Sequence, residues 1–293
     1  MNLVRTINSQ LRKGAWPRKT NLRGFTLSTK DSQRCCAAFT LPKQRERVSA
    51  FTLIELLVVV GIIALLLVLM APAFTYIKGG TDVTSAAYTI QGVLDAARTY
   101  AKASNTYTWV GFFEEDAPPP AGPSAIPGTG RVVMSIVASK DGTMIYTGNL
   151  SSAFTLDASP NQAALIQVGK LTKIDNVHLK TFTVPTATPP PDTFDTRPAV
   201  ASTASQIGDT APPSPSLTFH YPVGTSPGQY TFTKIVQFSP RGEGVIDNSN
   251  YTLASVSEIG VQPTHGTTVD TTSTNLVAIQ FTGIGGNVRI YRK

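Results

Sequence analysis

The sequence places one carboxylate where a negative charge is costly. Glu55 follows Phe51, Leu53 and Ile54 and precedes Leu56, so apolar residues surround it. A charged side chain in hydrocarbon costs about 2.5–3.5 kcal/mol or more unless it meets an opposite charge. Glu55 is therefore a candidate for pairing with a cation. The alternative interpretation is a glutamate at a helix end that only reaches polar headgroups.

The other reactive side chains do not form a catalytic or metal-binding pattern. His178, His220 and His265 are far apart and lack a metal-ligand spacing such as His-x3-His. The carboxylates at residues 114–116 adjoin a proline run, so we expect a solvated loop there. The glycine-rich segment 283–286 lacks the helix and the lysine of a phosphate-binding loop. The sequence thus predicts no enzyme, no metal site and no cofactor.

A long apolar run follows Glu55. Residues 56–77 contain no charged side chain, and about 20 helical residues cross the hydrocarbon core of a bilayer, which is about 30 Å thick. A buried core helix is the alternative, but core helices of soluble domains usually keep one polar face. The run is also longer than the core of a secretory signal peptide. We therefore predict a membrane span that is retained.

The charge is distributed unevenly along the chain. The net charge is +7; residues 1–50 hold eleven Lys or Arg against two Asp or Glu, and the remaining residues hold fourteen against sixteen. A positive leader favours the cytoplasmic side, which predicts a body outside the cytoplasm. The slightly acidic body argues against nucleic-acid binding. Both cysteines, Cys35 and Cys36, lie in the leader, so a chain without it has no disulfide.

Residues 49–64 resemble the class III signal of type IV prepilins and type II secretion pseudopilins, in which FTLIE opens a long apolar helix. The resemblance implies that a prepilin peptidase cuts between Ala50 and Phe51 and methylates the new amine of Phe51. Ala50 stands where that family prefers glycine. The resemblance further implies that Glu55 pairs with the N-terminal amine of a neighbouring subunit, and that Pro72 kinks the helix.

The rest of the chain predicts an α+β fold of pilin type. Residues 81–105 repeat apolar side chains with a period near 3.6, which predicts an amphipathic helix after a break at Gly79-Gly80. Short β-type runs follow, and no helical crossovers separate them, so antiparallel pairing is expected. The predicted fold is a long N-terminal helix, made of a membrane span and an amphipathic half, packed on a mainly antiparallel β-rich head. The predicted strands are 107–113, 131–138, 143–146, 164–168, 177–184, 216–221, 231–238, 251–258, 275–282 and 287–291.

The predicted domains are a leader at 1–50 that is removed, a span at 51–77, an amphipathic helix at 78–105 and a head at 106–293. Three proline-rich segments are expected to be surface loops that act as spacers rather than as recognition sites. They are 117–127, 185–198 and 211–227.

Two later regions resemble GspH/FimT-type pseudopilin domains. Residues 94–101, which include Arg98, resemble the Ala-Arg segment of those domains, and Arg98 is expected to make a structural or subunit contact. Residues 235–242 and 276–291 resemble their late strands, in which a Phe-x-Pro-x-Gly turn precedes the final hairpin.

Together these features predict a minor pilin or pseudopilin, a structural subunit of a type IV pilus or a type II secretion pseudopilus. Its partners would be the prepilin peptidase and methyltransferase, other pilin or pseudopilin subunits and the inner-membrane assembly platform. It would sit in the inner membrane with its N-terminus cytoplasmic and its head periplasmic, and then enter the filament. The alternatives are a membrane-anchored exported binding domain and a pilus-borne DNA receptor that uses Arg289, Arg292 and Lys293.

Overall fold

The computed structural model describes residues 52–119, 121–146, 150–159, 161, 164–183, 193–211, 216–246 and 252–293, without the side chains of residues 69–81. The chain forms two compact units, Met1–Leu53 and Ile54–Lys293. Only Thr52 and Leu53 of the first unit are described. The predicted cleavage residues, Ala50 and Phe51, lie outside the described residues.

Helix α1 (Leu53–Ala103) runs without interruption, so the break expected at Gly79-Gly80 is not present. Its C-terminal part buries one face, as the 3.6-residue period predicted, but the helix ends at Ala103 rather than at residue 105. Lys102 lies in the last turn, where a cation interacts favourably with the helix dipole. The buried residues of this face are Val83, Ala86, Ala87, Ile90, Leu94, Ala97 and Ala101.

The predicted fold class needs correction. A membrane-crossing helix requires about 20 consecutive apolar residues. Among the residues that the structure describes, no helix is both long enough and apolar enough to cross a membrane. The predicted combination of a membrane span and an amphipathic half is therefore wrong for the described structure. The fold is mainly antiparallel β-sheet, and the C-terminal part of α1 packs against it.

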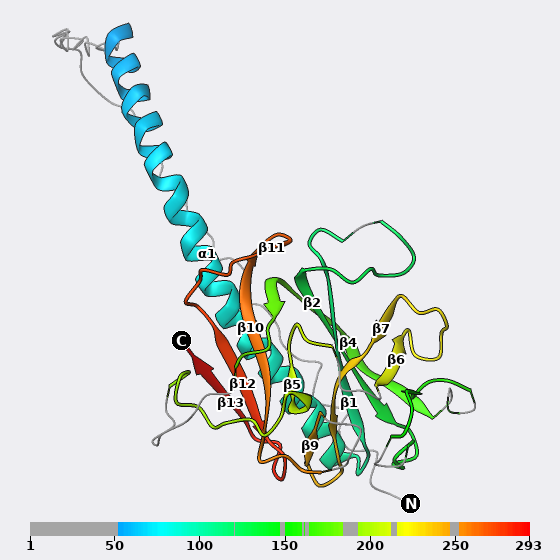
Figure 1. Cartoon of the computed structure of the whole chain (residues 1–293). Coiled ribbons are helices and arrows are strands. Elements are labelled where there is room, and N and C mark those ends of the chain that lie inside the picture. The colour runs from blue at the N-terminus through cyan, green and yellow to red at the C-terminus, as the bar shows by residue number, and fades with distance from the viewer. Residues whose placement is uncertain are drawn as a thin grey trace, which may run out of the picture. The chain divides into compact units, whose positions relative to one another are not determined.

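The head contains a large sheet in the order β13-β12-β10-β4-β2-β1-β8-β9 and a small sheet in the order β3-β6-β7 (Figure 1). The neighbouring strands in this order of the large sheet pair antiparallel, as expected. The two parallel pairs among the described strands are β5 with β10, at the side of the large sheet, and β3 with β6, in the small sheet. The strands of the large sheet are β1 (Thr108–Asp116), β2 (Gly130–Ser139), β4 (Leu165–Leu179), β8 (Lys234–Phe238), β9 (Gly244–Val245), β10 (Val256–His265), β12 (Val277–Thr282) and β13 (Val288–Arg292), with β5 (Gln206–Ile207) and β11 (Thr268–Val269) paired to β10; those of the small sheet are β3 (Phe154–Thr155), β6 (Leu217–Tyr221) and β7 (Tyr230–Phe232).

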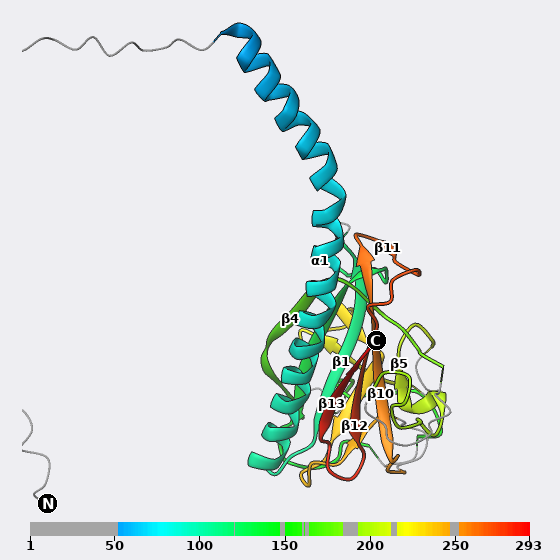
Figure 2. The same cartoon turned by 90° about the vertical axis from the view of Figure 1, so that its left-hand side faces the viewer.

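The large sheet is buried on both faces. Val110 and Phe112 of β1 belong to the cluster that α1 covers, whereas Trp109 of the same strand belongs to the cluster beneath the small sheet. This alternation follows from the two-residue period of a strand. Figure 2 shows the C-terminal part of α1 running along the sheet. The three layers of the head are therefore α1, the large sheet and the small sheet.

Several strand predictions are wrong in their limits. The separate strands predicted at 164–168 and 177–184 form one strand, β4, whose pairing with β2 shifts register twice. Asn176 of β4 has a φ of 61° and lies at one of these register shifts, as in a β-bulge. The strand continues beyond this residue. Residues 143–146 form no strand, and β10 begins at Val256 rather than at residue 251. The third proline-rich segment contains β6 and is not a loop throughout.

The predicted turn and final hairpin both form. Gly242, with a φ of 88°, closes the turn after β8 by donating its N–H to the carbonyl oxygen of Ser239 at 2.8 Å. Strands β12 and β13 pair as a hairpin whose loop contains Gly286 at a φ of 61°. Only glycine adopts such positive φ values at little cost. Gly244 of β9 donates to the carbonyl oxygen of Gly283 at 2.8 Å, which ties the turn to the hairpin.

Candidate functional site

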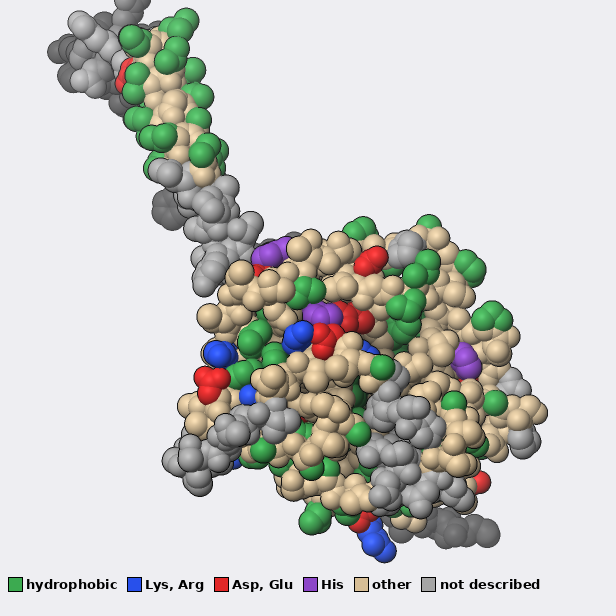
Figure 3. All heavy atoms as spheres, in the orientation of Figure 1, with side chains coloured by type: hydrophobic (Ala, Val, Ile, Leu, Met, Phe, Trp, Pro, Cys, Tyr) green, Lys and Arg blue, Asp and Glu red, His purple; other side chains and the backbone are tan. Residues whose placement is uncertain are grey.

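The N-terminal part of α1 exposes its apolar side chains. We call residues 53–68 the apolar segment. Its large side chains are between 47% exposed, at Val59, and 82% exposed, at Leu53. Figure 3 shows hydrophobic side chains along the visible side of this segment. No face of the apolar segment is buried, because every residue from Thr52 to Val68 is exposed.

The residues predicted to act in assembly lie on α1 or beyond the described residues. Glu55 is in the first turn of α1, inside the apolar segment, and is exposed. Pro72 lies within α1, and the helix continues through it. Processing between Ala50 and Phe51, pairing of Glu55 with an amine and a kink at Pro72 all remain predictions.

An apolar helix surface of this kind has a defined chemical capacity. Each Val, Leu or Ile that becomes buried contributes roughly 1.5–3 kcal/mol relative to exposure. Thirteen such side chains on the apolar segment are exposed, so burying them against another apolar surface would be favourable.

The three C-terminal cations do not converge. Arg289 and Arg292 of β13 are three residues apart in a strand, so their side chains leave opposite faces of the sheet. Arg289 lies over the ring of Tyr291, with 5.6 Å from its guanidinium carbon to the ring centroid. Lys293 is paired with Asp195 at 3.3 Å. The structure thus does not assemble these cations into one nucleic-acid-binding surface.

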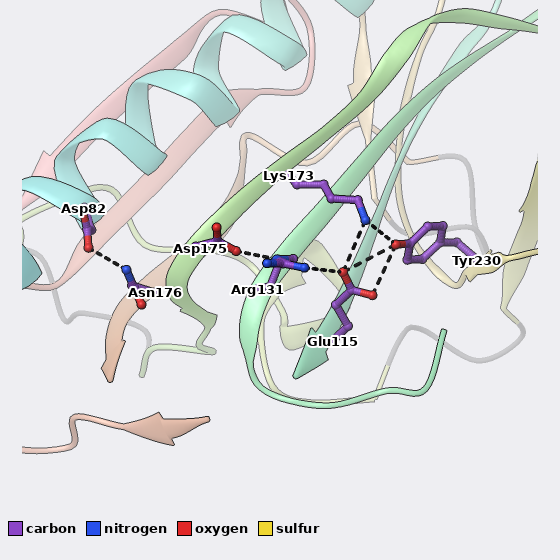
Figure 4. A network of polar contacts seen from close by, with 7 residues as sticks. All are labelled: Asp82, Glu115, Arg131, Lys173, Asp175, Asn176 and Tyr230. Atoms are coloured by element: carbon purple, nitrogen blue, oxygen red, sulfur yellow. Dashed lines mark hydrogen bonds and ion pairs between the residues drawn. The ribbon is translucent and has the colours of Figure 1, made fainter. Parts of the chain in front are cut away.

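The carboxylates at residues 114–116 are not in a solvated loop, which corrects the sequence prediction. They form the end of β1, and Glu115 is only 1% exposed. Its carboxylate lies 3.4 Å from Nη1 of Arg131 and 3.6 Å from Nζ of Lys173, and the hydroxyl of Tyr230 donates to it at 3.3 Å (Figure 4). Sequence reasoning missed this network because the proline run favoured a loop and the three partners are distant in sequence.

The network joins the two sheets of the head. Lys173 of β4 donates to the hydroxyl of Tyr230 of β7 at 2.6 Å, and this hydrogen bond raises the pKa of Lys173. Arg131 of β2 also pairs with Asp175 of β4, and that hydrogen bond raises the pKa of Arg131. Both cations therefore stay protonated at neutral pH and neutralise the buried carboxylate of Glu115. The arrangement is that of a structural ion-pair network.

The three histidines each contact one carboxylate. His178 Nδ1 lies 2.5 Å from Glu114, and His220 Nδ1 lies 3.0 Å from the buried Asp157. His265 Nε2 lies 3.9 Å from Asp270. The described part of the chain contains no group of three His, Cys, Asp or Glu residues placed to hold a metal ion.

Comparison with known proteins adds no relative: no family model, no curated protein and no solved structure matches the chain.

Proposed function

We propose that this chain is a structural subunit of a filament of the pilin or pseudopilin class, and that it assembles through the apolar segment of α1. The observation that carries the proposal is the exposure of the apolar side chains of residues 53–68 around the whole circumference of the helix. Helices that are apolar all round belong in an apolar environment. Equivalent helices of neighbouring subunits supply such an environment when they bundle together.

Glu55 has a specific role in this proposal. It is the acidic residue of the first turn of α1, among exposed apolar neighbours. When helices bundle around it, the carboxylate is stabilised by a cation of the neighbouring subunit. Cleavage between Ala50 and Phe51 would create such a cation, namely the amine of Phe51. A prepilin peptidase and methyltransferase, other pilin or pseudopilin subunits and an assembly platform are the corresponding partners.

The head supports a structural rather than a catalytic role. Its buried charged side chains are engaged in ion pairs, Glu115 with Arg131 and Arg197 with Glu258. The extracytoplasmic location of the head belongs to the same proposal. We do not extend the proposal to a DNA receptor, because Arg289, Arg292 and Lys293 do not share one surface.

The proposal is tested by isolating filaments from the native cell and sequencing the N-terminus of this subunit by mass spectrometry. We expect a chain that begins at N-methylated Phe51. We also expect that Glu55→Gln abolishes incorporation into filaments, whereas Asp95→Asn, which removes one negative charge from the helix within the head, does not. A native chain that keeps residues 1–50 and never co-purifies with related subunits would refute the proposal.

A further inference from the structure

Asn176 joins the irregular position of β4 to helix α1. Its Nδ2 donates a hydrogen bond to Oδ2 of Asp82 at 2.9 Å, and Figure 4 shows the two side chains pointing toward each other from the strand and the helix. In the pairing of β4 with β2, the residues on either side of Asn176 face the adjacent residues Gly130 and Arg131, so Asn176 is the extra residue of the bulge. Bulges of this kind redirect a side chain.

The backbone of the bulge does not by itself require an asparagine. The φ of Asn176 is 61°, which lies in the left-handed region. Asparagine tolerates this region better than most residues, but glycine adopts it without a steric cost. The hydrogen bond to Asp82 is the described interaction of Asn176 that a glycine could not make.

The neighbouring residue anchors the bulge within the sheet. Asp175 pairs with Nε of Arg131, and Nη1 of Arg131 lies 3.4 Å from the buried carboxylate of Glu115. Asp175 and Asn176 thus have different partners, one on the neighbouring strand and one on the helix (Figure 4). The hydrogen bond to Asp82 is therefore made from a position that the sheet holds fixed.

Asp82 lies at the start of the buried face of α1. Val83, the next residue, is 0% exposed and belongs to the core, whereas every residue from Thr52 to Val68 is exposed. Figure 2 shows α1 continuing beyond the sheet on this side. When a helix is held over only part of its length, the contacts at the end of the held part decide the direction in which the remainder projects.

We propose that Asn176 and Asp82 form a clamp that fixes the direction in which α1 leaves the head. The apolar contacts that hold α1 on the sheet are non-directional, whereas a hydrogen bond requires a particular distance and angle between its two groups. Without the clamp, the first buried turn of α1 is free to lift from the sheet, and the helix then projects over a range of directions. The clamp lies within a single chain, so the inference does not depend on the proposed filament function.

The test measures the distance between two spin labels, one on α1 and one on the head, by double electron–electron resonance. The parent chain is the full-length protein in detergent, labelled at the exposed positions Val68→Cys and Lys170→Cys and carrying Cys35→Ser and Cys36→Ser. We expect one narrow distance distribution for it. Asn176→Gly allows the same φ and removes the hydrogen bond. We expect about tenfold more of these chains at distances outside the parent distribution, because one hydrogen bond to a charged group changes an equilibrium by roughly that factor.

Two comparisons make the assignment specific to this pair. Asn105→Gly is the matched control, because Asn105, with a φ of 48°, lies beyond the end of α1 and is the other non-glycine residue of positive φ in the described part of the chain. We expect the parent distribution for it. Combining Asp82→Asn with Asn176→Asp exchanges donor and acceptor, and we expect the parent distribution here too. Asn176→Asp alone places two carboxylates together and should broaden the distribution.

Three results would overturn the proposal: an unchanged distribution for Asn176→Gly, an equal broadening for Asn105→Gly, or a failure of the exchanged pair to restore the parent distribution. Urea unfolding of each variant checks that the head is folded. If Asn176→Gly does not fold, Asp82→Ala removes the same hydrogen bond from the helix side. Alanine favours the helix, so broadening in that variant comes from the lost clamp and not from a weakened helix.

Discussion

Arg197 and Glu258 form a two-point ion pair inside the head. Nε and Nη2 of Arg197 donate to the two carboxylate oxygens of Glu258 at 2.6 and 3.2 Å. Their side chains are 2% and 1% exposed. Gln206 and Gln280 donate to the same carboxylate at 3.2 and 2.8 Å, and the guanidinium of Arg197 lies 4.4 Å from the ring centroid of Phe194. The pair thus connects three strands with the segment that contains Arg197.

Removing one partner of this pair leaves the other charge buried, which typically costs 3–5 kcal/mol. We therefore expect Arg197→Met to lower the free energy of unfolding by about that amount, as measured by urea denaturation. Lys293→Met is the control: its ion pair with Asp195 is largely exposed, so the expected loss is at most about 1 kcal/mol. Equal losses for the two variants would show that burial does not set the cost.

The network around Glu115 gives a second prediction. Glu115→Leu leaves the hydroxyl of Tyr230 without its acceptor and leaves Lys173 without its buried counter-charge, and we expect a loss of about 2–4 kcal/mol in unfolding free energy. Adding Lys173→Met removes one of the abandoned groups, so the double variant should lose less than the sum of the single variants. Strictly additive losses in urea denaturation would argue against the network.

Two glycines should respond in opposite directions to alanine. A Cβ on Gly111 of β1 would lie 2.6 Å from Phe219 and Phe232 of the small sheet, so Gly111→Ala should destabilise the head by about 1–3 kcal/mol. A Cβ on Gly92 of α1 meets nothing within 4 Å. Gly92→Ala should therefore stabilise the chain by about 0.5–1 kcal/mol through helix propensity. Thermal unfolding of both variants checks the contrast, and a shift of the same sign in both would contradict it.

Asp209 should contribute a pH dependence to stability. Burial raises the pKa of Asp209, but hydrogen bonds from Lys180 at 2.5 Å and from the backbone of Thr181 at 3.0 Å outweigh it and bring the pKa to about 2, below the ordinary value of 3.8. Because the folded pKa is depressed, this contribution is complete above pH 3.8 and is lost as the pH falls towards 2. Melting temperatures from pH 6 to pH 2 should fall more steeply for the native chain than for Asp209→Asn. Parallel curves for the two proteins would contradict this assignment.

Local patterns were sufficient for several elements. The 3.6-residue period after residue 81 identified the buried face of α1 from Val83 to Ala101, because a helix repeats its contacts at that spacing. Alternating apolar residues located β2 and β12 within one or two residues of their ends. The glycines after β8 and β12 marked the turn and the hairpin loop, because these positions require positive φ.

Other features depended on pairing between distant parts of the chain. The proline run beside Glu115 indicated a loop, yet the residue is buried because Arg131, Lys173 and Tyr230 surround it. The apolar residues after Glu55 indicated a membrane span, and no helix in the described structure meets that description.

Composition and spacing thus determined the types and approximate limits of many elements, together with an apolar helix start that carries one acid. The tertiary structure decided which charges are buried, which strands join and where Asn176 contacts α1. The physical reason is that hydrophobic periodicity reports a residue's local surroundings, whereas the burial of a charge depends on partners that only the fold brings within hydrogen-bonding distance.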